Sequence, residues 1–420
     1  MAEGYKIPRG TFDILPSESY KWNYVMATFR RIAESYGYHQ ITTPIFEQSD
    51  LFERSVGDAT DIIQKEMYRF QDRKGRSLAL RPEGTAPVVR SFVENNLLYE
   101  KKGNRLYYMG PMFRYDRPQK GRYRQFYQYG VENFGSDHPY IDAEVIALGY
   151  SFLKELGLTD FSLEINSIGT AKSSEVHNAA LSAYFEPHLE ELCADCRTRL
   201  NKNPKRLLDC KVPSCRAIAG NAPSMLAYLD EESAAHFARV QEYLTLMEIP
   251  FTINPTIVRG LDYYSKTAFE YINNNLGSQN ALAGGGRYDT LVEQLGGKAT
   301  TGIGFAGGFE RLILSMEQEN LSFGEVPHPR IFLVSLGDEA EKTAIKLLTD
   351  LHNAGISAAF DVDKTTLNAQ MKAAGKSDTD FTGIMGDDEI KSGKISLKNM
   401  RSGEQILIPI NELITFLKKN

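Results

Sequence analysis

Residues 104–135 read NRLYYMGPMFRYDRPQKGRYRQFYQYGVENFG. Two short runs of apolar and polar residues flank a polar centre, a pattern that predicts two strands joined by a hairpin. Between residues 114 and 124 this centre contains one acid, Asp116, and five basic residues, Arg114, Arg117, Lys120, Arg122 and Arg124. A solvated hairpin tip explains such charge. A phosphate site explains it as well, because guanidinium groups match phosphate oxygens and the aromatic residues that follow can stack on a base.

The whole chain has the composition of a globular protein. Its 420 residues are 42% hydrophobic and 24% charged, with a net charge of −6, which argues against disorder and coiled coil. A chain of this length predicts two or three domains. No apolar run approaches the roughly 18 residues that a membrane helix needs, and the N-terminal residues lack the apolar core of a signal peptide. We therefore expect a cytoplasmic protein with no membrane partner.

The order of the predicted elements indicates an α+β protein. Short strands and hairpins, including one predicted to turn at Lys74 and Gly75, favour a mainly antiparallel sheet in a domain spanning residues 1–325. This domain is interrupted at 170–245, where the pattern is polar and helical and indicates an inserted helical domain. Strands then alternate with amphipathic helices, which predicts a separate α/β domain at 326–420.

Four cysteines lie inside the predicted insertion. Cys193 and Cys196 are spaced C-x2-C, and Cys210 and Cys215 follow as C-x4-C, a spacing compatible with a four-sulfur zinc site. Ordinary thiols on a small helical domain explain the same spacing. So few cysteines in a long chain do not make a disulfide scaffold, and they favour a reducing compartment.

Residues 81–90, RPEGTAPVVR, offer a site for a positively charged group. The carboxylate of Glu83 and the hydroxyl of Thr85 flank the flexible residue Gly84, and together they can receive an ammonium. A helix that begins with Thr85 as its N-cap explains the same residues. The segment alone does not separate these two interpretations.

Two later segments carry arginines beside glycines. In residues 258–264, VRGLDYY, Arg259 ends an apolar strand, where it can face a pocket or make an ordinary surface pair. Nine glycines within 284–308 lie close in sequence to Arg287 and Arg311. Dense glycine permits close approach of the backbone, either to a nucleotide or to another strand. The chain contains no G-x4-G-K-[ST] loop, so a nucleotide would be bound by a different design.

Taken in this order, the segments resemble the histidyl-tRNA synthetases, a family of class II aminoacyl-tRNA synthetases, over essentially the whole chain. The resemblance implies an antiparallel catalytic sheet of about six strands flanked by helices, a helical insertion, a C-terminal anticodon-binding domain and a homodimer built around motif 1. The segments that carry it are GTFDILP at 10–16, Pro44 in the motif 1 region, RPEGTAPVVR at 81–90, motif 2 at 113–135, VRGLDYYSKTAFEY at 258–271 and motif 3, GFAGGFERLIL, at 304–314.

The resemblance also assigns roles in ATP binding and catalysis to individual residues. It implies that Arg114 and Arg259 are catalytic and contact the α-phosphate of ATP from opposite sides. It implies that Phe126 and Arg311 enclose the adenine. Arg122 completes the implied ATP site.

For the amino acid, the resemblance implies a pocket that recognises histidine at both ends. Glu83, Thr85 and Gln128 are implied to hold the amino group, while Glu132 and Tyr264 hydrogen-bond the two imidazole nitrogens. The residues implied to form the histidine site are Glu83, Gly84, Thr85, Arg114, Gln128, Glu132, Arg259, Tyr263, Tyr264 and Tyr288.

The implied reaction has two steps. The histidine carboxylate attacks the α-phosphorus of ATP to give histidyl-adenylate and pyrophosphate, and the histidyl group then passes to the terminal adenosine of tRNA(His). Gln119 and Arg124 are implied to contact the acceptor end of that tRNA. Mg²⁺ is implied to bind through the ATP phosphates. Because the family as a whole does not depend on zinc in the insertion, no residue is assigned as a metal ligand.

Three other functions compete with this one. The regulatory subunit of ATP phosphoribosyltransferase resembles the catalytic domain and binds histidine, but such a protein is expected to lack the C-terminal domain and the reactive arginines. A synthetase for another amino acid is disfavoured by RGLDYY and Glu132. A simple nucleic-acid-binding module explains the basic hairpin but not the histidine pocket. We therefore expect an aminoacyl-tRNA synthetase.

Overall fold

The two strands predicted around the basic hairpin are β5 (Arg105–Phe113) and β6 (Gln125–Phe134), which pair antiparallel with Met112 opposite Phe126. This prediction is therefore confirmed. The structure is a computed structural model, and it describes residues 4–56, 60, 62–100, 103–119, 121–208, 210, 212–257 and 263–419.

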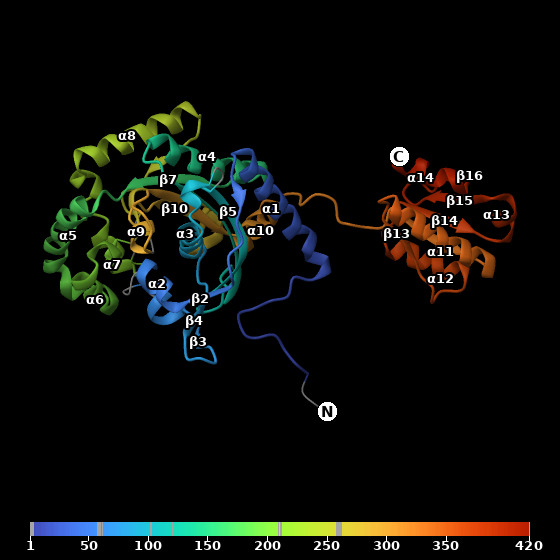
Figure 1. Ribbon diagram of the computed structural model, residues 1–420, viewed down its shortest axis with the longest axis horizontal. Coiled ribbons are helices and arrows are strands. Elements are labelled where there is room, and N and C mark those ends of the chain that lie inside the picture. Colours follow the sequence, from blue (N-terminus) through green and yellow to red (C-terminus); the bar gives the residue numbers. More distant parts are fainter. Residues whose placement is uncertain are drawn as a thin grey trace. The chain divides into compact units, whose positions relative to one another are not determined.

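Strands β5 and β6 belong to a sheet that contains eight strands among the described residues (Figure 1). Neighbouring strands are antiparallel except for the pairs β1–β5 and β7–β8, which are parallel. The two outermost strands have only two residues each, so the mainly antiparallel sheet of about six strands is confirmed, with two short strands added at its edges. The spatial order is β1 (His39–Gln40), β5, β6, β11 (Gly302–Gly308), β10 (Ala281–Arg287), β9 (Ser265–Ile272), β7 (Ser162–Ser167) and β8 (Thr252–Ile253).

Helices cover both faces of this sheet because successive strand residues point to opposite sides. Tyr129 of β6 packs in the larger core with Phe29 and Phe152. Phe134, an odd number of residues along the same strand, points to the other face and packs in a second core with Phe92. The larger core is covered by α1 (Pro16–Ser35), α4 (Pro139–Glu155), α8 (Glu231–Leu246) and α10 (Phe309–Gln318). The second is covered by α3 (Thr85–Glu94) and α9 (Leu291–Gln294).

A smaller three-stranded sheet lies beside α2 (Ser49–Val56), with order β2 (Phe46–Gln48), β4 (Ser77–Leu80) and β3 (Arg69–Gln71). The predicted hairpin at Lys74 and Gly75 joins β3 to β4 and is confirmed. Gly75 has a φ of +78°, a backbone conformation that glycine adopts without steric cost. The π-helix Ile62–Glu66 and the 3₁₀ turn Leu97–Tyr99 complete this region.

Between β7 and α8 the chain leaves the sheet and forms a group of helices with its own small apolar core (Figure 1). Residues Leu181, Phe185 and Leu207 are fully buried in this core, and three of the four cysteines are buried with them. The elements are α5 (Ala171–Phe185), α6 (Ala194–Lys202), α7 (Pro213–Ala219) and 3₁₀ turns at Glu186–Glu191, Pro204–Leu207 and Met225–Tyr228.

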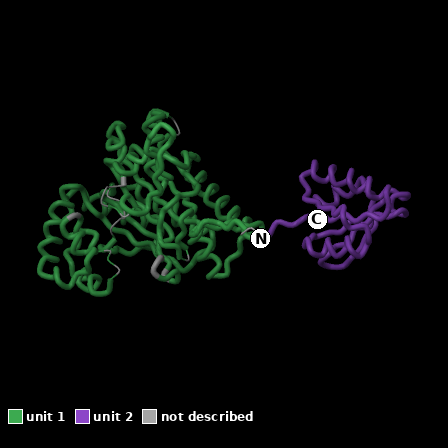
Figure 2. Tube along the Cα trace, turned by 90° about the horizontal axis from the view of Figure 1, so that it is seen from below, with its two compact units in different colours: residues 1–324 green, residues 325–420 purple. Residues whose placement is uncertain are grey.

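The described chain divides into two compact units, residues 1–324 and 325–420 (Figure 2). In the second unit a five-stranded sheet mixes parallel and antiparallel pairs. Every helix among the described residues is too short or too polar to span a lipid bilayer. The second unit contains β12 (Ile331–Ser335), α11 (Asp338–Asn353), β13 (Ala358–Phe360), α12 (Leu367–Lys376), β14 (Phe381–Met385), α13 (Asp387–Ser392), β15 (Lys394–Asn399), β16 (Gln405–Pro409), the 3₁₀ turn Ile410–Glu412 and α14 (Leu413–Lys419).

A buried ion pair joins the sheet to the helices on the larger core. Arg287, at the end of β10, is fully buried, and its Nε donates to both carboxylate oxygens of Asp142 on α4, at 3.1 and 3.2 Å. The same carboxylate accepts from Thr267 of β9 and pairs at 2.8 Å with the imidazole of His236 on α8. Burial alone would raise the pKa of Asp142, but Arg287 and His236 hold it below its usual range. Arg287 is therefore a structural residue and not a nucleotide ligand of the glycine-rich segment.

The ion pair gives a stability prediction. Arg287→Met nearly keeps the side-chain volume but removes the cation from the buried Asp142, which should lower the free energy of unfolding by about 3–5 kcal/mol in urea titration. The matched control is Arg31→Met, because Arg31 makes an exposed pair with Glu155 that should contribute no more than about 1 kcal/mol. Equal losses in the two variants would contradict the structural role of the buried pair.

Candidate active site

A cavity of about 280 Å³ opens above the middle of the large sheet, where β6, β10 and β11 meet the basic hairpin and the start of α10. Nine of the residues assigned from the sequence line it, although they come from four separate segments of the chain. These nine are Glu83, Thr85, Arg114, Arg122, Phe126, Gln128, Tyr263, Tyr264 and Arg311.

The alternation of β6 decides which of its side chains reach this face. Phe126, Gln128 and Glu132 are an even number of residues apart, so they share one face of the strand. Tyr129 and Val131 point to the other face and pack in the larger core. A single strand thus contributes side chains to three parts of the implied site: adenine, amino group and imidazole.

The N-terminus of α3 places Glu83 at the cavity. Its carboxylate accepts hydrogen bonds from the backbone N–H groups of Thr85 at 2.7 Å and Ala86 at 2.8 Å. Glu83 therefore caps the helix, and Thr85 is not the N-cap but the first helical residue. Burial raises the pKa of Glu83, while these N–H groups and the nearby guanidinium of Arg114 oppose that shift.

Gln128 presents a hydrogen-bond acceptor to the same cavity. Its Oε1 is buried, and within the described residues no donor contacts it. Buried polar atoms are almost always paired, so such an atom in a cavity wall is a good candidate to receive a ligand donor. On the sheet Gln128 lies opposite Gly110 of β5 and Gly308 of β11.

Glu132 lies next to the cavity and is fully buried. Its carboxylate accepts from the hydroxyl of Thr85 at 2.7 Å and from the hydroxyl of Tyr288. Burial raises the pKa of Glu132 to about 8, although both hydroxyl groups act against the shift. On β11 only a glycine fits opposite, because a Cβ at Gly304 would collide with the Glu132 carboxylate.

The tyrosines assigned to the histidine pocket form one group. The ring centroids of Tyr263 and Tyr264 are 4.6 Å apart, and that of Tyr288 is 5.7 Å from Tyr263. Tyr288 reaches Glu132 behind the cavity wall, while the other two line the cavity. Gly84 also lies just behind the wall, where a Cβ would collide with the ring of Tyr108.

Three guanidinium groups gather at the cavity. Arg114 donates from Nε to the carbonyl of Pro82 at 2.8 Å, and its guanidinium carbon lies 5.3 Å from the centre of the Phe126 ring. Arg311 donates to the carbonyl of Ala281 at 2.8 Å. Burial lowers the pKa of Arg311, and the charges of Arg114 and Arg122 lower it further. Guanidinium groups held this close to one another favour an anion between them.

The hairpin between β5 and β6 supplies the remaining basic groups. Arg122 pairs with Asp116 and lies 3.6 Å from the carboxylate of Glu66. Arg124 stacks on the Tyr115 ring, with its guanidinium carbon 3.8 Å from the ring centre. Gln119 is exposed at the tip and pairs with Arg122 through the backbone. Neither Gln119 nor Arg124 lines the cavity.

The residues assigned from the sequence and the residues that line the cavity are not the same set. Arg259, the second catalytic arginine assigned from the sequence, lies outside the described residues. Three carboxylates that line the cavity, Asp116 on the hairpin, Glu270 on β9 and Glu310 on α10, were not assigned from the sequence. Burial raises the pKa of Glu310 to about 7, and its carboxylate accepts from the backbone N–H of Tyr127 at 2.8 Å. Glu270 and Glu310 belong to segments quoted for the resemblance, but as single acids they gave no separate signal in the sequence.

The raised pKa of Glu132 gives a pH prediction. Between about pH 4.5 and pH 8 the unfolded chain ionises this carboxyl and the folded chain keeps it protonated, so its contribution to stability is complete at low pH and is lost as the pH rises to about 8. Glu132→Gln removes the titration. The free energy of unfolding of the parent minus that of the variant should therefore fall by up to a few kcal/mol between pH 5 and pH 8 in urea titrations.

Glu242→Gln is the control for that experiment, because it removes an exposed carboxylate on α8. Its difference from the parent chain should change much less over the same range. A difference for Glu132→Gln that does not change with pH would show that this carboxyl is ionised in the folded chain.

Comparison with known proteins finds similarity over nearly the whole chain. The family model for histidyl-tRNA synthetase matches residues 10–312, and that for an anticodon binding domain matches residues 330–420. The chain is 49% identical over 420 residues to the histidine–tRNA ligase of Bacillus licheniformis and 49% identical over 414 residues to that of Halothermothrix orenii, with 99% of each chain covered in both cases.

A solved structure agrees with these sequence matches. The crystal structure of apo histidyl-tRNA synthetase from S. aureus superimposes with a TM-score of 0.84 at 41% identity, covering 99% of this chain and 100% of that one. The chain therefore belongs to the histidyl-tRNA synthetase family.

Proposed function

We propose that the chain activates L-histidine with ATP and transfers the histidyl group to tRNA(His). The observation that carries this proposal is the single cavity lined by Glu83, Gln128, Phe126 and three arginines. It combines acceptors for an ammonium, an aromatic face for a base and cations for a phosphate. These are the groups that a histidine and an ATP in reacting contact require.

The amino acid is expected to lie with its α-carbon between Glu83 and Arg114. A carboxylate and a guanidinium close enough to affect each other's pKa match the ammonium and the carboxylate of an α-amino acid. The unpaired Oε1 of Gln128 and the hydroxyl of Thr85 would complete the ammonium site. This arrangement anchors the part that all amino acids share.

Selection of histidine would fall to Glu132 and Tyr264. An imidazole has two nitrogens, and a site that hydrogen-bonds both rejects side chains that leave these buried groups unpaired. Gly84, Tyr263 and Tyr288 would shape the walls around the ring. To meet the imidazole, the Glu132 carboxylate would exchange its bond from Thr85 or Tyr288 for one from the substrate.

The first chemical step needs little proton transfer. A histidine carboxylate oxygen forms a bond to the α-phosphorus, the bond to the β-phosphate oxygen breaks, and pyrophosphate leaves with that electron pair. Arg114 and Arg259 would stabilise the charge that builds on the α-phosphate oxygens, and Arg122 would contact the outer phosphates. Phe126 and Arg311 would hold the adenine between an aromatic face and a guanidinium plane.

Mg²⁺ is proposed to accompany ATP. Magnesium in such sites takes one or two carboxylates together with phosphate oxygens, and Glu270 and Glu310 supply carboxylates at the cavity wall. When bound, the ion would neutralise charge on the phosphates. The residues of the chain would still provide the orientation of both substrates.

The tRNA would contact two regions of the chain. Gln119 and Arg124, on the hairpin outside the cavity, are proposed to meet the acceptor end. Residues 326–420 are proposed to be the anticodon-binding domain, with 1–325 as the catalytic domain and 170–245 as its insertion. The match of residues 330–420 to the anticodon binding domain family supports this division.

A homodimer built around motif 1 is also proposed. The small sheet exposes apolar side chains beside this motif, since Ile45, Phe46 and Phe70 are 45%, 52% and 42% exposed. Exposed apolar groups that cluster in this way favour a protein interface. A sedimentation measurement at micromolar concentration should give twice the mass of the chain, and a monomer would contradict the proposal.

A cytoplasmic location remains a prediction from the sequence.

The regulatory subunit of ATP phosphoribosyltransferase remains the alternative. It would bind histidine in a similar pocket without charging tRNA. Arg114 and Arg311 line the cavity, and residues 330–420 match the anticodon binding domain family. Both observations favour the synthetase.

ATP–pyrophosphate exchange, run with each amino acid in turn, tests the function. Histidine alone should support exchange, and Arg114→Gln should lower its rate by about 100-fold or more, because one donor to the reacting phosphate is lost. Arg73→Gln, which removes an exposed arginine from the β3–β4 turn, should leave the rate nearly unchanged.

Exchange that depends on another amino acid would overturn the pocket assignment. Histidine binding without exchange in the parent chain would support the regulatory alternative.

A further inference from the structure

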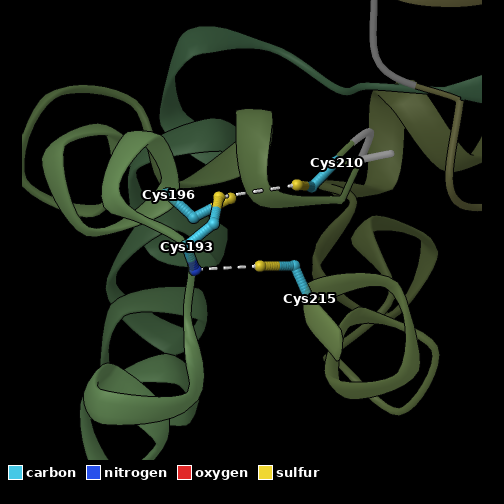
Figure 3. A group of neighbouring side chains, drawn as sticks. All are labelled: Cys193, Cys196, Cys210 and Cys215. Carbon is cyan, nitrogen blue, oxygen red and sulfur yellow. Dashed lines mark hydrogen bonds between the residues drawn. The ribbon is translucent and has the colours of Figure 1, made fainter. Parts of the chain in front are cut away.

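The insertion brings its four cysteines to one point. Cys193 precedes α6 and Cys196 lies in its first turn, while Cys210 follows the 3₁₀ turn Pro204–Leu207 and Cys215 lies on α7. Figure 3 shows the first pair facing the second pair across a small gap. We refer to these residues as the cysteine cluster. Three separate segments of the insertion therefore converge on one set of sulfur atoms.

The distances in the cysteine cluster are close to those of a tetrahedral metal site. All four Sγ atoms lie within 4.8 Å of one another, and those of Cys193 and Cys210 are 4.0 Å apart. Zinc bonds to thiolate at about 2.3 Å, so the sulfurs of a regular tetrahedron are about 3.8 Å apart. Small side-chain rotations are enough to bring the four sulfurs to that spacing.

The surroundings bury most of the cysteine cluster and provide a weak donor to sulfur. Cys196, Cys210 and Cys215 are buried, whereas Cys193 is partly exposed and gives the cluster one side toward solvent. The backbone N–H of Cys193 donates to the sulfur of Cys215 at 3.2 Å. Such N–H groups stabilise thiolate ligands.

We propose that the cysteine cluster binds one Zn²⁺ through four thiolates. Four cysteines of the required spacing supply the ligand set of a closed structural zinc site, with no position left for water or substrate. Paired disulfides fit less well, because all four Sγ atoms lie within 4.8 Å of one another as one compact group and not as two separate pairs.

The ion would hold the insertion together. The apolar core around Leu181, Phe185 and Leu207 is small, and cores of this size are usually reinforced by a metal or by disulfides. Zinc would fasten α6, α7 and the segment containing Cys210 to one another. The cysteine cluster shares no residue with the wall of the substrate cavity, so its role would be structural and not catalytic.

Metal analysis of the untagged full-length chain, purified without chelators, tests the proposal. Elemental mass spectrometry should find about one zinc per chain, and X-ray absorption at the zinc edge should show four sulfurs at about 2.3 Å. Cys196→Ser should lower the zinc content at least severalfold. Thr198→Ala is the matched control, because Thr198 is exposed and lies two residues beyond Cys196 on α6. This variant should keep the full zinc content.

The X-ray absorption measurement uses the parent chain, so it decides the question even if Cys196→Ser fails to fold. Zinc with nitrogen or oxygen ligands would overturn the proposal. So would bound iron in place of zinc, disulfides in the freshly purified chain, or less than one zinc per several chains. A failed exchange assay with zinc bound would contradict the proposed function and leave this inference intact.

Discussion

The register of β6 between β5 and β11 is the constraint on which the active site depends. Because strand side chains alternate, this register turns Phe126, Gln128 and Glu132 toward the cavity and buries Tyr129 in the larger core. A slip of one residue would exchange these two sets of side chains. Gly304 secures the arrangement, since only a residue without a Cβ leaves room for the Glu132 carboxylate. The close packing of β11 against β6 therefore also positions the carboxylate that is proposed to select the substrate.

Charge in the cavity is arranged to receive a molecule that carries both signs. Guanidinium groups that lie close to one another repel, and the pKa of Arg311 is lowered by burial and by the charges of Arg114 and Arg122. The phosphates of a bound triphosphate would offset this repulsion, and the carboxylate of Glu83 would meet the ammonium of an α-amino acid. On this view the protein holds its donors in place before the substrates arrive, which is how fixed dipoles and charges stabilise a developing transition state.

Much of this arrangement could be predicted from the sequence. The β5–β6 hairpin and the β3–β4 hairpin follow from local alternation and turn residues, and nine assigned residues meet at one cavity. Single acids such as Glu270 and Glu310 gave no separate signal, because their importance comes from neighbours on distant strands. The sequence also cannot distinguish Arg287, which pairs with Asp142 in the core, from an arginine that faces a ligand. Likewise, the spacing of the cysteines does not show that all four sulfurs meet at one point, because this depends on how the fold brings three segments together.

A crystal structure of the chain bound to a non-hydrolysable analogue of histidyl-adenylate tests the proposed site most directly. We expect the imidazole between Glu132 and Tyr264, the phosphate mimic against Arg114, and the adenine on the Phe126 ring. An analogue bound elsewhere, or bound in this cavity with its imidazole turned away from Glu132, would contradict this arrangement.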